Sequence, residues 1–116
     1  MKTTTRPREA SLSETARLNE TLINKATIGD LAGVVDTYRA GADINASYMG
    51  QSAMDYAARI GHADIVDFLV NYGAKVYPET VRMAQRGGHA EIAQKLKTVL
   101  AKERQSDREF AGVMRE

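Results

Sequence analysis

Parts of this chain repeat themselves at an interval of 32 residues. Three small residues of the first half each recur 32 positions later, as Ala58, Gly61 and Gly73. Farther along, residues 88–93 repeat residues 61–66 with only an Asp→Glu and a Val→Ala change. Self-similarity with a period of about 33 residues is typical of stacked repeats in which each unit is a turn followed by two helices. The pattern therefore predicts a stack that binds another macromolecule on one face and has no inherent chemistry.

The composition fits one small domain of this kind. The chain has 116 residues, which is enough for about three repeats. Its 16 basic and 15 acidic residues nearly balance, so no strong electrostatic attraction to nucleic acid or to a membrane is expected. The sequence has no cysteine, no apolar run of the roughly 18–20 residues that span a bilayer, and no apolar segment behind its charged amino terminus. These features predict a cytoplasmic protein without disulfides, thiolate metal sites or a membrane segment.

Changes in composition divide the chain into three parts. Residues 1–10 are polar and are expected to form a flexible N-terminal arm. Residues 11–104 are expected to form the repeat domain, and residues 105–116 a C-terminal tail. Within the domain, the glycine positions predict repeats at about 11–45, 46–77 and 78–104.

Cap and turn residues place the helices. The run Ser11–Glu14 fits a capping box and predicts a helix from about Leu12. Gly29 is expected to end this helix, and Asp30 is placed to cap the next one. The two helices of the middle repeat are expected at about 52–60 and 64–72.

The middle repeat carries the most specific pattern. It contains Ser52-Ala53-Met54-Asp55, Ala57-Ala58, Gly61-His62, Ile65-Val66, Leu69-Val70 and Gly73-Ala74. This series resembles the ankyrin repeat family, whose usual repeat has a Thr-Pro-Leu-His start, an Ala-Ala pair, Gly-His, Ile-Val, a Leu-Leu pair and Gly-Ala. The resemblance covers about residues 20–100. It implies an all-α solenoid of about three helix-turn-helix repeats, with short finger turns and a C-terminal helical extension.

The sequence departs from the family pattern in three places. Asp55 replaces the histidine of the four-residue start, so the usual hydrogen-bond link between neighbouring repeats is expected to be altered or absent. Gly61 and Gly88 are 27 residues apart instead of 32, which predicts a shortened second finger with a tight corner at Pro78. The third repeat carries Lys95 and Lys97 where the middle repeat has Phe68 and Val70. A terminal capping repeat requires such a solvent-exposed polar face.

Candidate catalytic and metal-binding residues are few. His62 and His89 each follow a glycine at corresponding points of two repeats, and a role in bonding the preceding turn explains them better than a metal or general base, which would need further converging groups. Three carboxylates of the middle repeat are read as capping or solvating groups: Asp55, Asp64 and Asp67. The run Arg86-Gly87-Gly88 lacks the remaining glycine and the preceding strand of a phosphate loop. We therefore expect no enzyme, no cofactor and no metal.

The resemblance implies a protein partner. In this family, partners usually meet the finger tips and the exposed side of the first helix of each repeat. By position, these places are Tyr48, Met49, Gln51, Arg59, Ile60, Thr27, Ile28, Arg82 and Arg86. Aromatic, methionine and arginine side chains are enriched at interface hot spots. Tyr48 and Met49 stand out because a turn tip has no core to fill, although packing onto the next repeat would also account for them.

Several interpretations stay open. We expect a monomer that binds one protein stoichiometrically, as an adaptor, an inhibitor or an immunity-type protein. Self-assembly through the finger or tail is a first alternative, and nucleic-acid binding through Arg6, Arg8 and the basic tail is a second. In the tail, Phe110, Val113 and Met114 are spaced as one apolar side of a helical turn. The tail could therefore fold back over the last repeat, be disordered, or present a helix to a partner.

Overall fold

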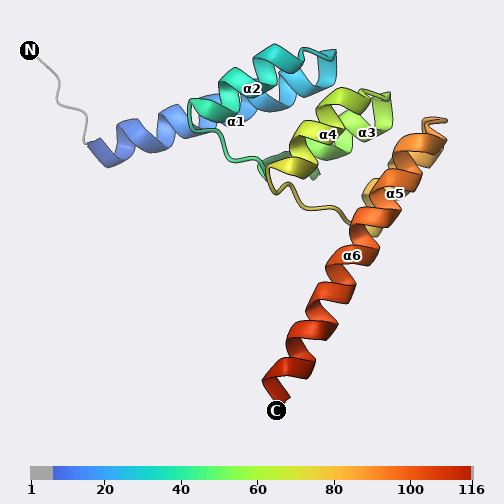
Figure 1. Ribbon diagram of the computed structural model, residues 1–116. Helices are drawn as coiled ribbons and strands as arrows, with labels where there is room; N and C mark the ends of the chain where they lie inside the picture. The colour runs from blue at the N-terminus through green and yellow to red at the C-terminus, as the bar shows by residue number, and fades with distance from the viewer. Residues whose placement is uncertain (1–6, 116) are drawn as a thin grey trace, which may run out of the picture.

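The molecule is a row of helix pairs joined by short turns (Figure 1). The computed structural model describes the backbone of residues 7–115 and the side chains of residues 14–103. The elements in chain order are α1 (Pro7–Ile28), α2 (Leu31–Arg39), β1 (Ser47–Tyr48), β2 (Gln51–Ser52), α3 (Ala53–Ile60), α4 (Ala63–Asn71), α5 (Pro78–Arg86) and α6 (Ala90–Arg115). The prediction of an all-α chain is confirmed, since the described strands hold four residues only.

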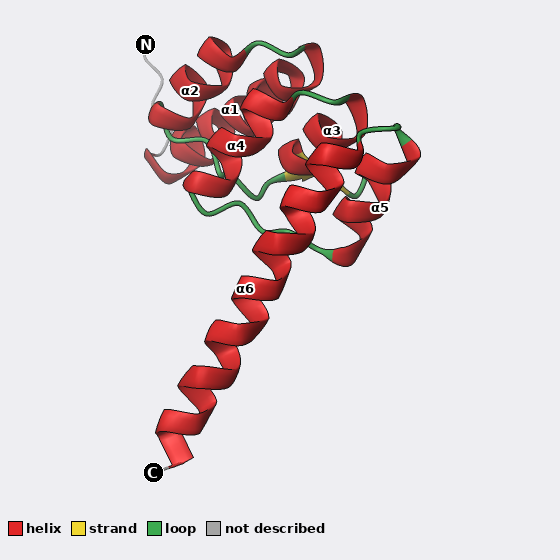
Figure 2. Ribbon diagram, turned by 45° about the vertical axis from the view of Figure 1, so that its right-hand side comes forward, coloured by secondary structure: helices red, strands yellow, loops and turns green. Residues whose placement is uncertain are grey.

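The helices form two layers. The first helices of the three pairs pack side by side, α1 against α3 and α3 against α5, while α2 lies next to α4 (Figure 2). Each pair is itself packed, α1 with α2, α3 with α4 and α5 with α6. The apolar core runs between the layers, and its fully buried side chains come from every repeat: Leu22, Met54, Ile65, Leu69 and Leu96. This is the stack of helical hairpins that the sequence repeat predicts.

Turn chemistry fixes where the middle helices begin and end. The Asp30 carboxylate accepts a hydrogen bond from the Gly33 amide at 2.9 Å, so the predicted cap of α2 is confirmed. Ser52 and Asp55 form a capping box at the start of α3. The helix ends at Gly61, which has a φ of 104° that a side-chain-bearing residue rarely adopts.

The first finger is a β-hairpin, and the second is a plain connection. β1 and β2 pair antiparallel with Ser47 opposite Ser52, around a two-residue turn in which Met49 and Gly50 both have positive φ. The connection from α4 to α5 has no strand, and Pro78 is the first residue of α5. The predicted shortening of the second finger is confirmed.

The amino-terminal boundary differs from the prediction. α1 begins at Pro7, so the expected helix start near Leu12 is wrong, and residues 7–10 of the expected arm are helical. Proline is well suited to the first helical position, and Glu9 and Ala10 continue the helix into the Ser11–Glu14 run. Ser11 therefore lies inside the helix and not at its cap. Residues 1–6 lie outside the described part of the chain.

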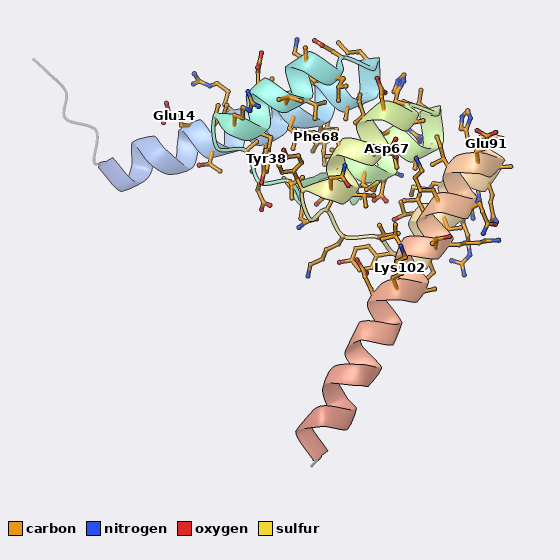
Figure 3. The ribbon with its side chains drawn as sticks, viewed as in Figure 1. Glu14, Tyr38, Asp67, Phe68, Glu91 and Lys102 are labelled. Carbon is orange, nitrogen blue, oxygen red and sulfur yellow. The ribbon has the colours of Figure 1, made fainter. Side chains whose placement is uncertain are left out.

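The carboxyl-terminal helix extends well past the repeats. α6 is 26 residues long, and both ribbon views show its second half running away from the other helices (Figures 1 and 2). Lys102 marks the point at which it leaves them (Figure 3). The tail is thus neither folded back nor unstructured, because no helix-breaking residue follows Ala90 until Gly112. The side chains of Phe110, Val113 and Met114 lie outside the described ones.

The extension gives the molecule an elongated shape. The radius of gyration is 16.8 Å, whereas a compact domain of this length has about 13 Å.

Candidate functional site

The tip of the first finger is the most exposed apolar part of the described chain. Tyr48 is 57% exposed and Met49 is 81% exposed. More than half of each side chain is therefore open to solvent. Met49 has a φ of 55°, a left-handed conformation that non-glycine residues adopt at some cost. The finger therefore displays two large side chains to solvent on a strained turn.

A tyrosine of α3 connects this finger to the exposed side of the helix. The Tyr56 hydroxyl donates to the Tyr48 carbonyl oxygen at 3.2 Å. The Arg59 guanidinium lies over the Tyr56 ring, 5.3 Å from its centroid, which is a cation–π distance. Tyr48, Tyr56 and Arg59 thus follow one another from the finger along α3. Tyr56 was missed at the sequence level, although its spacing of three residues from Arg59 placed both on one side of the helix.

Two arginines continue this surface onto α5. Arg82 and Arg86 both contact the Glu79 carboxylate, at 2.8 and 3.3 Å, and all three side chains are largely exposed. The ends of α3 and α5 touch here, because a Cβ placed on Gly87 would lie 2.2 Å from the Arg59 carbonyl oxygen. Gly87 therefore permits the close approach of the α3 and α5 backbones at this point. We call the set Tyr48, Met49, Tyr56, Arg59, Arg82 and Arg86 the α3–α5 face.

A hollow lies beside this face where the second finger is short. A cavity of about 340 Å³ lies between the first finger and the start of α5. Asn45 and Gly50 of the finger, Lys75 of the shortened connection and Glu79 of α5 are among its walls. The Asn45 side chain accepts from the Lys75 amide at 2.9 Å, so the finger and the connection are held together across one edge of the hollow.

Asp55 links two repeats at the floor of this region. One carboxylate oxygen accepts from the Ser52 amide, and the other accepts from the Thr80 hydroxyl at 2.8 Å. Thr80 is only 1% exposed and belongs to the next repeat. The inter-repeat hydrogen bond that the family histidine usually makes is therefore altered, and not absent, in this chain.

The remaining predicted site residues lie elsewhere. Thr27 and Ile28 are the last residues of α1, and Ile60 is the last residue of α3. They therefore lie at the carboxyl ends of these helices and not in the finger. The Thr27 hydroxyl bonds the Ile23 carbonyl, so its side chain is occupied within its own helix. Ile28 is 69% exposed and Ile60 is 39% exposed, and they occupy equivalent positions of two repeats. Gln51, in β2 of the finger, is half-buried, and its side-chain oxygen is enclosed. Its side chain is therefore less available to a partner than those of Tyr48 and Met49.

The histidines and carboxylates singled out from the sequence have structural contacts. His62 Nε2 lies 3.1 Å from the Thr27 carbonyl oxygen of the preceding repeat. Asp64 accepts from the Ile65 amide, and Asp67 pairs with Lys95 of α6. Lys95 and Lys97 are exposed, whereas Phe68 is half-buried, so the wetter face of the last repeat is confirmed. Among the residues whose side chains are described, no three histidine or carboxylate groups gather as metal ligands would.

The middle repeat matches a known family. Residues 49–77, which span the finger tip, α3 and α4, match the model of the ankyrin repeat. This segment is an ankyrin repeat. Ankyrin repeats are protein–protein interaction modules without a catalytic centre of their own. The matched segment of this ankyrin repeat protein includes Met49, Tyr56 and Arg59, the middle part of the α3–α5 face.

The other ankyrin features agree with this assignment. The turn after the first helix of each pair contains a glycine with a left-handed backbone, at Gly29, Gly61 and Gly88. In the described part of the ankyrin chain, none of the helices combines the length and the apolar character that crossing a bilayer requires.

Proposed function

We propose that this ankyrin repeat protein binds one protein partner stoichiometrically through the α3–α5 face, as an adaptor, an inhibitor or an immunity-type protein. The observation that carries the proposal is the continuous line from the exposed finger tip through Tyr56 to Arg59 and the α5 arginines. Tyrosine and arginine are the side chains most enriched at the centres of protein interfaces. Ankyrin repeats act by binding proteins, and the face lies on the helices and finger that the family uses.

The proposal has no catalytic component. The two carboxylates of this region serve structural contacts, because Glu79 pairs with both α5 arginines and Asp55 caps α3. We accordingly propose a binding protein of the cytoplasm and not an enzyme.

Affinity capture from the native host tests the proposal. The tagged wild-type chain is expected to retain a partner at constant stoichiometry, and the double variant Tyr48→Ala/Met49→Ala is expected to lose most of it. Removing two exposed side chains at a tip leaves the core intact, so circular dichroism should be unchanged. The matched control is Tyr72→Ala, which removes another half-exposed tyrosine from the end of α4. Equal capture by the wild type and the finger variant would contradict this assignment of the site.

A second candidate function is self-assembly through the projecting part of α6. It is favoured by one observation, the length of helix that both ribbon views show clear of the repeats (Figures 1 and 2). Light-scattering mass measured over a hundred-fold range of protein concentration distinguishes the two candidates. A monomer mass throughout supports the binding function alone, and a mass that rises to twice that value supports assembly.

A further inference from the structure

The α3–α5 face and its hollow have an excess of positive charge. Four cations lie there, Arg59, Lys75, Arg82 and Arg86, against the two carboxylates Asp55 and Glu79. The single Glu79 carboxylate contacts both α5 arginines. Among the side chains that the structure describes, neither Arg59 nor Lys75 has a carboxylate within 4 Å. The chain as a whole is nearly neutral, so this excess is local.

The two carboxylates are already engaged and the arginines are not saturated. Both Asp55 oxygens accept hydrogen bonds from the protein. Arg82 and Arg86 each use one terminal nitrogen, Nη1, to contact Glu79. A guanidinium has five N–H donors in a fork that matches a carboxylate. The face therefore retains donor capacity for carboxylates from outside.

Arg59 is also positioned to bind a carboxylate from outside the chain. Its guanidinium rests on the Tyr56 ring, which is itself tied to the finger by the hydrogen bond to the Tyr48 carbonyl. An arginine held over an aromatic ring loses less side-chain freedom when it binds an anion, so it binds more favourably than a mobile one. Arg82 and Arg86 are four residues apart, which puts neighbouring side chains about 5–6 Å apart on a helix.

We propose that the partner presents an acidic segment, with two or more Asp or Glu side chains beside an apolar residue. The carboxylates bind Arg59, Arg82 and Arg86, and the apolar residue contacts the Tyr48–Met49 tip. This inference rests on the proposed function and adds the chemistry of the partner. A protein segment suits the face better than nucleic acid, because nucleic-acid affinity depends on neutralising many phosphates and the chain as a whole is nearly neutral.

A peptide-display selection on the full-length immobilised protein tests the inference. Random 12-residue peptides selected at 50 mM NaCl are expected to be enriched in Asp and Glu at least two-fold over the input library. The Kd of a selected peptide, measured by fluorescence anisotropy, is expected to weaken several-fold at 300 mM NaCl because the contacts are solvent-exposed. The double variant Arg59→Glu/Arg86→Glu is expected to weaken it at least ten-fold.

Two controls make the result specific. Arg39→Glu reverses an exposed arginine of α2, away from the face, and should leave the Kd within two-fold. A peptide whose acidic residues are replaced by lysine should bind the Arg59→Glu/Arg86→Glu variant better than it binds the wild type. Circular dichroism of each variant establishes that it is folded.

Each outcome decides between the two proposals. Peptides that lose binding on Tyr48→Ala/Met49→Ala but show no acidic enrichment and no response to Arg59→Glu/Arg86→Glu would overturn the acidic partner and leave the binding face standing. Selected peptides whose binding changes with neither double variant, or a selection that yields no binder, would count against both the binding face and the acidic partner. Tighter binding of a 16-nucleotide single strand or duplex than of any peptide would replace the protein partner with nucleic acid.

Discussion

Histidine rings of one repeat occupy the space that a glycine of the preceding repeat leaves open. A Cβ added to Gly29 would lie 2.7 Å from the His62 ring, and one added to Gly61 would lie 2.4 Å from the His89 ring. Both glycines also have left-handed backbones. At the scale of the residue, the recurring Gly-His pair is thus explained by contact between neighbouring repeats, which supports the structural interpretation of both histidines.

Gly61→Ala is expected to be more destabilising than Gly73→Ala. Both glycines have a left-handed φ, 104° and 92°, so both variants pay a backbone cost of about 1–3 kcal/mol. Only Gly61 has a ring in the way, whereas nothing lies within 4 Å of a Cβ at Gly73. Urea denaturation measures the difference, and adding His89→Ala to Gly61→Ala should recover part of it. Equal losses for the two glycine variants would show that the ring moves aside freely.

Thr80→Val tests the hydrogen bond between repeats. The hydroxyl donates to Asp55 and also accepts from the Tyr77 amide, so its loss leaves buried polar groups without partners. We expect a loss of about 1–3 kcal/mol in the free energy of unfolding. Thr37→Val is the matched control, a buried threonine whose hydroxyl bonds only the Gly33 carbonyl of its own helix. A Thr80 variant no less stable than the Thr37 variant would argue against a role for Asp55 in coupling the repeats.

The elements were more predictable than their ends. The period of 32 residues located the helix pairs, and Asp30 located a cap, because small residues and caps act through local geometry. The start of α1 at Pro7 was not predicted. The Ser11–Glu14 run has the sequence of a capping box, and this local pattern looks the same whether a helix begins there or continues through it. The Asp55–Thr80 bond and the Tyr56–Arg59 contact depend on how α3, α5 and the finger pack, which no single segment specifies. The exposure of the finger tip was predictable since apolar residues in a turn have no core to join, and its role as a binding site stays a prediction.

Deleting residues 104–116 is expected to leave the repeats intact. The ribbon of α6 beyond Lys102 runs away from the other helices (Figure 3), so we expect the deletion to leave the core of the repeats unchanged. The free energy of unfolding should change by less than about 1 kcal/mol. Leu96→Ala is the contrasting variant, because it empties a fully buried site on the same helix and should cost about 2–5 kcal/mol. If the deletion cost as much as Leu96→Ala, the extension would be part of the folded core.

The whole molecule offers two aromatic surfaces to a partner. One is the finger with Tyr48, and the other is a cluster on the α2–α4 layer, where Tyr38, Phe68 and Tyr72 lie with ring centroids 4.5–5.9 Å apart (Figure 3). Each ring of the cluster packs on another, whereas among the described side chains the Tyr48 ring stacks on no other ring. We therefore propose that the partner binds the finger side of the stack.

Photo-crosslinking in the native host decides between these surfaces most directly. A benzophenone amino acid is placed at position 48 in one variant and at position 72 in a second. The two tyrosines have similar exposure, 57% and 52%, so the probe is equally accessible at both. We expect a covalent adduct with a single protein from position 48 and little or none from position 72. An adduct formed from position 72 alone would place the partner on the outer helices and contradict the binding face described above.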